Sequence, residues 1–253
     1  MKAARDTGLL FHRYTVQMLR NPVWLVVGFS TPVLYLVLFT PLLRSLPGVQ
    51  GFPTGGVLQI FLPGILALLA YSSGASAGFG TIFDLQSGFI ERLRVTPASR
   101  FAILFGPILS GLVTMTVFDA VVVVVGVGFG FHVHWAGLLV LTVLLWLLAS
   151  LMAAFSTAVA LVTKEISSFA AVINGINLPL LLLAGVLLPI SLGPLWLRVL
   201  AHLNPLYYLV VASRSLAAGH IATSVVWQAF AVLVPLCVLV LAWATRVFRR
   251  AVA

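Results

Sequence analysis

Long apolar segments, separated by short polar or Gly- and Pro-containing stretches, make up most of the 253-residue chain. A helix needs about 20 mainly apolar residues to cross the hydrocarbon layer of a membrane. Six segments meet this requirement, at residues 24–40, 58–79, 101–129, 136–162, 166–188 and 225–247. The pattern therefore predicts an all-α, polytopic membrane protein with six transmembrane helices in a single domain over residues 1–253.

A polar stretch at residues 81–100 interrupts this pattern after the second predicted span. Its side chains separate into two faces at helical spacing, which predicts a short amphipathic helix. The polar face holds Asp84, Gln86, Ser87, Glu91, Arg92 and Arg94, and the apolar face holds Ile82, Leu85, Phe89, Ile90 and Leu93. Thr96 can cap the next helix, and Pro97 suits its first position. Such a helix lies at the bilayer surface and can contact a soluble partner, but a solvated loop that only joins two spans also fits.

The N-terminal residues 1–21 show a similar two-faced pattern. Leu10, Phe11, Tyr14 and Met18 form one face of a helix, and Arg13, Gln17 and Arg20 form the other. The pattern predicts a helix that lies along the membrane interface before the first span. We interpret it as a membrane anchor rather than as a functional site.

Residues 189–224 are apolar but broken by Pro189, Gly193, Pro194 and Pro205. We expect two short helices that enter the membrane and return, rather than a seventh span, with the break at Asn204-Pro205. This re-entrant hairpin should pack against the helix bundle or a cavity near the outer face. Three aromatic residues in it are either interfacial anchors or substrate contacts, and both interpretations are open: Trp196, Tyr207 and Tyr208.

Basic residues predict the orientation of the chain. With six spans, eleven Lys and Arg residues fall on the side that holds both termini and residues 81–100, whereas three fall on the other side. Because positive charge accumulates on the cytoplasmic side, both termini should be cytoplasmic. A seventh span would place the basic C-terminus outside, so the count also supports the re-entrant interpretation.

Composition leads to the same class of protein. The chain is 62% hydrophobic and 8% charged, with a mean hydropathy of +1.18, which leaves too little polar surface for a soluble globule. The net charge of +9 sits beside apolar segments, where it meets anionic lipid headgroups, so we expect membrane lipids and no nucleic acid as partners. Cys237 has no second cysteine to pair with. His132 and His134 lack further ligands, so no metal site is expected.

Polar residues inside the predicted spans are costly and therefore mark candidate functional positions. Asp119 either lines a substrate path or pairs with Arg214 or with hydroxyl groups, and we favour the pairing because one acidic group makes no proton relay. Asn174 and Asn177 mark a hydrogen-bonded region of the fifth span. The small residues at 72–80, with a Gly-xxx-Gly spacing, predict helix packing rather than a binding site.

Two motifs resemble those of the ABC type-2 exporter permeases, the group that contains daunorubicin-resistance and polysaccharide or lipid-export permeases. The first is ERLRVTPASR at residues 91–100, which is similar to the segment after the second span in that family. The second is Asn-Pro-Leu-Tyr-Tyr at residues 204–208, followed by Ala-Ser-Arg at 212–214 and by Gly219. Their order and the spans around them extend the resemblance over essentially the whole chain.

The resemblance implies the membrane-spanning permease subunit of an ATP-driven exporter in the bacterial cytoplasmic (inner) membrane. Expected partners are two nucleotide-binding ATPase subunits, which hold the ATP and Mg²⁺, and a second permease copy, identical or paralogous. The substrate would be hydrophobic or amphipathic, such as a drug, lipid or glycolipid. The residues expected to couple to the ATPase are Asp84, Phe89, Ile90, Glu91, Arg92, Arg94 and Thr96. A translocation path or outer gate would use Asp119, Asn174, Asn177, Trp196, Tyr207, Tyr208 and Arg214.

Other function classes fit less well. The only lysines, Lys2 and Lys164, do not follow a glycine, so the chain has no P-loop and no ATPase of its own is expected. An intramembrane serine hydrolase built on Ser72 or Ser73 would need a histidine base in a span, and none is present. An ion-coupled secondary transporter is the alternative, although Asp119 is the one clearly buried acid expected and no internal repeat is apparent.

Overall fold

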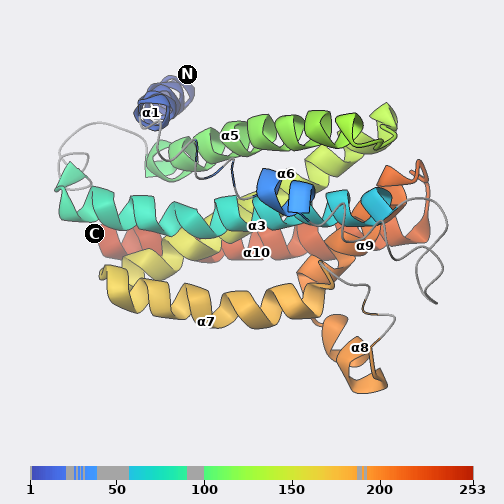
Figure 1. Cartoon of the computed structure of the whole chain (residues 1–253). Coiled ribbons are helices and arrows are strands. Elements are labelled where there is room, and N and C mark those ends of the chain that lie inside the picture. Colours follow the sequence, from blue (N-terminus) through green and yellow to red (C-terminus); the bar gives the residue numbers. More distant parts are fainter. Residues whose placement is uncertain are drawn as a thin grey trace.

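A computed structural model describes residues 2–20, 26, 28, 30, 32–38, 57–89, 100–186, 190 and 193–252 of the chain. The main secondary-structure elements within these ranges are helices, which confirms the all-α prediction for this part of the protein. In chain order they are α1 Lys2–Leu19, α3 Val57–Gln86, α5 Arg100–Gly128, α6 Trp135–Thr163, α7 Ile166–Ala184, α8 Leu195–Ala201, α9 Pro205–Ala217 and α10 Ser224–Val252 (Figure 1).

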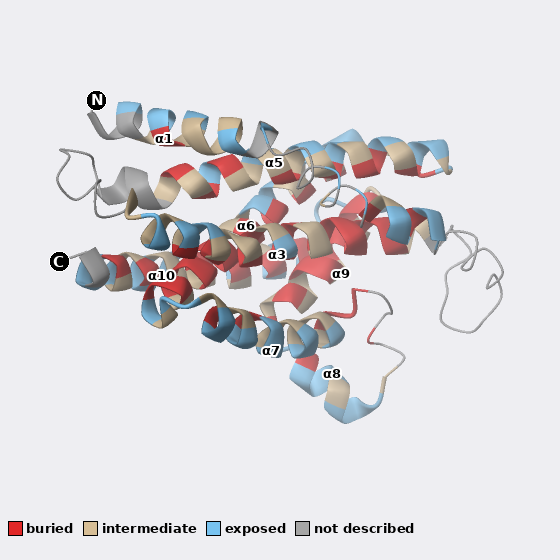
Figure 2. Cartoon of the chain, turned by 60° about the vertical axis from the view of Figure 1, so that its left-hand side comes forward, coloured by how far each residue is buried: buried red, intermediate tan, exposed pale blue. Residues whose placement is uncertain are grey.

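Five of the described helices are long and apolar enough to cross a membrane: α3, α5, α6, α7 and α10. They lie side by side in one bundle and coincide with five of the six predicted spans (Figures 1 and 2). The predicted first span, residues 24–40, is described only in part, at residues 26, 28, 30 and 32–38. The helical positions described there, 32–38 among them, do not test its length.

Two helix ends differ from the prediction. The second span continues as α3 to Gln86 rather than ending at residue 79, so Asp84 belongs to the last turn of a long helix and not to a separate surface helix. The helix ends where Ser87 and Gly88 form a turn, with Gly88 at a φ of 67°. Likewise α7 ends at Ala184 instead of residue 188, because Gly185 adopts the left-handed conformation and its N–H bonds the carbonyl of Leu182.

The core lies between α3 and α6, where small residues let the two helices approach closely. A methyl group at Gly74 would stand 2.6 Å from the carbonyl oxygen of Ala149. One turn later the Ser156 hydroxyl donates to the carbonyl of Ala75 (2.8 Å) and accepts from the Gly78 N–H (2.6 Å). Buried residues gather along α3, α6 and α9 (Figure 2). The predicted packing role of residues 72–80 is thus confirmed.

The two ends of the bundle carry different elements. One end holds α1, the C-terminus of α10, the turn after α3 and the connection from α6 to α7 (Figures 1 and 2). The opposite end holds α8 and the start of α10, with α9 extending from it into the bundle. This arrangement confirms the predicted grouping of segments, because residues 87–89 and both terminal helices lie together. Which end faces the cytoplasm stays a prediction.

The predicted break at Asn204-Pro205 is present. Helices α8 and α9 meet there at 94°, as two segments of a broken span or of a re-entrant loop. Only α9 packs into the bundle, where Leu206, Leu209 and Leu216 are fully buried. Most apolar side chains of α8 are instead exposed, with Leu195 77% and Trp196 62% accessible, although Ala201 at its end is buried. The expected packing against the bundle or an outer cavity is therefore seen for α9, whereas most apolar side chains of α8 stay exposed beside α7.

Candidate functional site

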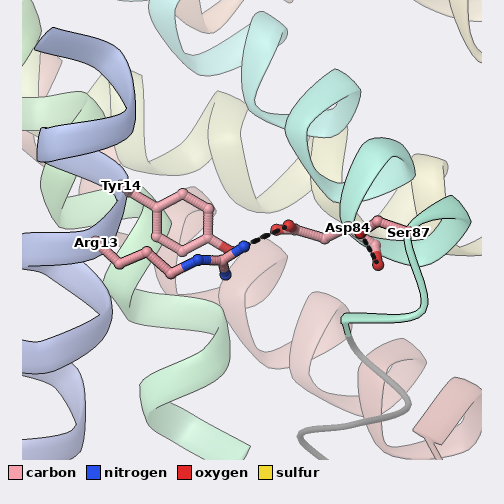
Figure 3. Close-up of polar contacts among 4 residues, drawn as sticks. All are labelled: Arg13, Tyr14, Asp84 and Ser87. Carbon is pink, nitrogen blue, oxygen red and sulfur yellow. Dashed lines mark hydrogen bonds and ion pairs between the residues drawn. The ribbon is translucent and has the colours of Figure 1, made fainter. Parts of the chain in front are cut away.

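A polar cluster joins α1 to the last turn of α3, and we call it the α1–α3 junction: Arg13, Tyr14, Asp84 and Phe89. The Tyr14 hydroxyl donates a hydrogen bond to Oδ2 of Asp84. Nη2 of Arg13 lies 3.6 Å from Oδ1 of the same carboxylate. Figure 3 shows both side chains reaching from α1 toward Asp84, with Ser87 donating to the Asp84 carbonyl at 3.2 Å. The carboxylate thus binds two side chains from a helix 70 residues earlier in the chain.

Arg13 also contacts Phe89, which follows the turn that ends α3. The guanidinium carbon lies 3.3 Å from the centre of the Phe89 ring and 5.2 Å from that of the Tyr14 ring. Such cation–π contacts contribute about 0.5–2 kcal/mol, depending on how far they are desolvated. Helix α1 therefore holds both the end of α3 and Phe89, which follows the turn at Ser87 and Gly88.

The protonation of Tyr14 suits its role as a donor. Burial and, next, the negative charge and hydrogen bond of Asp84 raise the pKa of Tyr14 above its ordinary value. The phenol therefore keeps its proton at neutral pH and can donate to the carboxylate.

Helix α1 is itself fixed against α5. The hydroxyls of Thr15 and Ser110 lie 3.1 Å apart. A methyl group at Gly106 would stand 2.7 Å from Cβ of Leu10, so the two helices touch at that point. The junction consequently connects three helices, α1, α3 and α5, at one end of the bundle. Because α5 begins directly after residues 90–99, that segment is bounded on both sides by helices that α1 contacts.

Two of the seven predicted coupling residues lie in this junction. Asp84 and Phe89 are both held by α1 and are not free surface groups. The other five lie outside the described residues: Ile90, Glu91, Arg92, Arg94 and Thr96. Sequence reasoning missed Arg13 and Tyr14, which it assigned to a membrane anchor. No spacing rule links residues 13 and 14 to residue 84, so only the folded chain could bring them together.

Asp119 lies in α5, is 8% exposed, and its Oδ1 accepts no hydrogen bond from any described residue. The predicted pairing with Arg214 is wrong. Arg214 bonds backbone carbonyls, with Nη2 at 2.7 Å from Gly185 O and 3.3 Å from Val186 O, and with Nε at 3.3 Å from Ile60 O. Helix C-terminal carbonyls can satisfy a guanidinium as a carboxylate would, which sequence reasoning had not considered.

The two asparagines of α7 occupy different surroundings. Asn174 is exposed near the middle of the helix, and a Cβ added at its neighbour Gly175 would meet nothing within 4 Å. Asn177 has a buried Oδ1 that no described group bonds. A polar amide on an open face at membrane depth is costly in lipid, so this face is suited to contact with protein, water or a polar ligand.

The aromatic candidates are only partly brought together. Tyr207 and Tyr208 contact each other with ring centres 5.6 Å apart, and His202 lies 5.0 Å from the Tyr207 ring. The Tyr208 hydroxyl donates to the carbonyl of His202 at 3.0 Å, which supports the bend between α8 and α9. Trp196 stands on α8 with 62% of its surface exposed. The structure is compatible with both of their predicted roles, interfacial anchor and substrate contact.

A bundle of long apolar helices around a small-residue core, with a polar junction at one end and a broken helix at the other, defines a multi-pass membrane protein. Residues 5–218, from α1 through α9, match the family model described as ABC-2 type transporter. The chain therefore belongs to the ABC-2 type transporter family, and it is a transport permease. The resemblance inferred from its two motifs is confirmed.

Individual relatives agree with this assignment. The chain is 34% identical over 216 residues to the transport permease ycf38 of Cyanophora paradoxa. The aligned region covers 84% of this chain and 74% of that protein. It is 27% identical over 214 residues to the ycf38 permease of Porphyra purpurea, covering 83% and 73%. It is also 30% identical over 214 residues to the inner membrane transport permease YadH of Escherichia coli K12, covering 81% and 77%.

Proposed function

We propose that the protein is the membrane subunit of an ATP-driven exporter that moves a hydrophobic or amphipathic substrate outward. Membership of the ABC-2 family implies a partner ATPase subunit. The proposed assembly contains two ATPase subunits and two permease copies in a bacterial inner membrane, with both termini cytoplasmic. ATP and Mg²⁺ would be bound by the ATPase, since the chain has no P-loop.

The α1–α3 junction is the observation that carries this proposal. It connects Phe89, which directly precedes the first family-like motif in the sequence, to α1, α3 and α5. A push on that motif would first move Phe89, then Arg13 and α1, and at the same time the last turn of α3. Because α3 packs closely on α6 through Gly74 and Gly78, its displacement would carry the core with it.

ATP binding would bias this movement rather than drive a chemical step in the permease. Closure of the two ATPase subunits favours one of two arrangements of the bundle. ATP hydrolysis then allows the bundle to return to the other arrangement. The chain's own residues then have positional roles. Asp84 and Tyr14 join α1 to α3, and Arg13 joins α1 to Phe89.

The face of α7 that carries Asn174 is the proposed contact with the second permease copy or the substrate path. Asn174 is exposed near the middle of the helix, and Leu178 and Leu182, which lie on the same side of it, are exposed too. A mainly apolar face with one or two amides suits an amphipathic molecule better than an ion. This preference, together with the family assignment, favours a transporter of lipids or hydrophobic compounds over the ion-coupled alternative.

Truncating Phe89 tests coupling through the junction. The permease and its ATPase are reconstituted in nanodiscs, with spin labels on cysteines at Leu139 and Leu182, which are exposed at the opposite end of the bundle. We expect ATP with vanadate to shift the distance between the labels in the parent protein. Phe89→Ala should reduce that shift without dissociating the complex. Phe83→Ala is the matched control, because Phe83 is 59% exposed on the same helix end.

A shift in Phe89→Ala equal to that of the parent would show that the junction does not transmit the ATPase movement. Export is measured separately as ATP-dependent transfer of an NBD-labelled phospholipid to the outer leaflet of proteoliposomes. Absence of that transfer would contradict a lipid substrate but would leave the coupling result standing.

A further inference from the structure

Two side chains from the next part of the chain donate to carbonyl groups in the last two turns of α7 and in the two residues that follow it. The last carbonyls of any helix lack partners within the helix and need others when they are buried. Nδ2 of Asn204 donates to the carbonyl of Leu180 at 2.7 Å. Nη2 of Arg214 donates to the carbonyl of Gly185 at 2.7 Å and to that of Val186 at 3.3 Å. One donor is the N-cap of α9 and the other lies in its last turn, so α9 is attached to the end of α7.

The two attachments are well separated along α9. Asn204 is the N-cap of α9, where its Oδ1 accepts the N–H of Leu206 at 3.0 Å, and it is 3% exposed. Arg214 lies in the last turn of the same helix. Ten helical residues span about 15 Å. Two bonds at that separation oppose rotation of α9 against α7, which one bond would allow.

Arg214 also reaches a third helix. Its Nε lies 3.3 Å from the carbonyl of Ile60 in the first turn of α3. At the same place a methyl group on Gly64 of α3 would stand 2.5 Å from the carbonyl oxygen of Val186, so the backbones of α3 and of the α7 end are in close contact. A planar guanidinium can serve two helices at once because its N–H groups point along fixed, different directions.

The bond lengths rank these attachments. The shortest donor–acceptor distances, 2.7 Å each, join α9 to α7. The contact with α3 is longer, at 3.3 Å. Since hydrogen bonds weaken as they lengthen, the bond from Arg214 to Ile60 is weaker than the two 2.7 Å bonds that join α9 to α7. No described carboxylate pairs with Arg214, so the carbonyls alone hold its charge.

We infer that Asn204 and Arg214 are positioning residues that make α7 and α9 move as one body, and that the Arg214–Ile60 bond holds this body against α3 in the arrangement seen here. The inference rests on the proposed function, in which the bundle alternates between two arrangements. It also assigns a physical role to the second family-like motif. The side-chain oxygen of Asn204 caps α9, and its side-chain nitrogen donates to a carbonyl of α7.

Distances between spin labels test the attachment in the permease alone. One label pair joins α7 to the end of α9, at Leu182 and Ala218, and a second joins α3 to α9, at Gln59 and Ala218, in a Cys237→Ala background. The inference predicts a narrow α7–α9 distance distribution that broadens in Arg214→Lys, since an ammonium group cannot reach both helices in the same way. The matched control is Arg198→Lys on α8, because Arg198 donates to Gly193 and not to α7.

A second variant separates the two functions of the asparagine. In Asn204→Ser the hydroxyl can still cap α9, but it is too short to bond the α7 carbonyl. Broadening of the α7–α9 distances in this variant and in Arg214→Lys, with intact secondary structure by circular dichroism, supports the inference. Distances that stay as narrow as those of the parent in both variants would overturn it.

The reconstituted complex supplies the functional readout. With ATP and vanadate the α3–α9 distance should change while the α7–α9 distance stays constant, and Arg214→Lys should lower NBD-phospholipid transfer per ATP hydrolysed about tenfold, as expected for loss of a charge-assisted hydrogen bond. A nucleotide-dependent change in the α7–α9 distance would also overturn the inference. If nucleotide moves neither pair in the parent, the proposed function fails, whereas the distances in the permease alone still decide whether the attachment exists.

Discussion

The hydrogen bond from Tyr14 to Asp84 should contribute more to stability than any other contact of the α1–α3 junction. A hydrogen bond to a charged group contributes about 1.5–3 kcal/mol. The ion pair of Arg13 with the same carboxylate contributes less, about 0.2–1 kcal/mol, because its nitrogen and oxygen are 3.6 Å apart and the arginine side chain is 37% exposed. The structure therefore predicts that Tyr14 stabilises the junction more than Arg13 does.

A double-mutant cycle measures that ranking. Tyr14→Phe removes one hydroxyl, and Asp84→Asn removes the negative charge with little change of shape. We expect Tyr14→Phe to lower the free energy of unfolding by about 1.5–3 kcal/mol in the parent and by about 0.5–1.5 kcal/mol in the Asp84→Asn background, where the amide oxygen still accepts a neutral hydrogen bond from the Tyr14 hydroxyl. The corresponding cycle with Arg13→Gln and Asp84→Asn should give a coupling energy below about 1 kcal/mol.

The free energy of unfolding is measured in mixed micelles with increasing dodecyl sulfate, followed by fluorescence of the six tryptophans. Ser87→Ala is the control, since that hydroxyl donates only to the backbone carbonyl of Asp84 and not to its carboxylate. If the effects of Tyr14→Phe and Asp84→Asn add to within about 0.5 kcal/mol, the charge of Asp84 does not strengthen its bond to Tyr14 and the junction is not held as described.

Two further predictions concern topology and packing. A cysteine at Gly88 should resist an impermeant external thiol reagent in intact cells while one at Gly193 is labelled, and labelling of Gly88 would reverse the orientation given by the basic residues. Gly74→Val should destabilise the bundle by about 1–3 kcal/mol or more, because even a single methyl group on residue 74 would stand 2.6 Å from the α6 backbone. Gly80→Ala, where a Cβ meets nothing within 4 Å, should leave the thermal midpoint unchanged, and equal midpoints for both variants would contradict the packing described for α3.

Local patterns in the sequence were sufficient to predict most of the helices and to identify the family. Hydrophobic length predicted five spans that the described helices confirm, and proline after asparagine predicted the break at residues 204–205. These features depend on neighbours within a few turns, so periodicity and turn chemistry reveal them. The length of α3 was underestimated for a related reason. A helix ends where its backbone conformation changes, at Gly88, and not where its side chains cease to be apolar.

The partners of the polar residues were decided only by the tertiary structure. Asp84 binds side chains 70 residues away, and Arg214 binds a carbonyl 154 residues away, so no spacing in the sequence records either contact. The sequence suggested an acid for Arg214 because opposite charges are the obvious pair. Packing instead placed this guanidinium against the end of α7, where carbonyls without helical partners accept its hydrogen bonds. A backbone carbonyl is present at every residue, and only the fold determines which ones are left to be bonded.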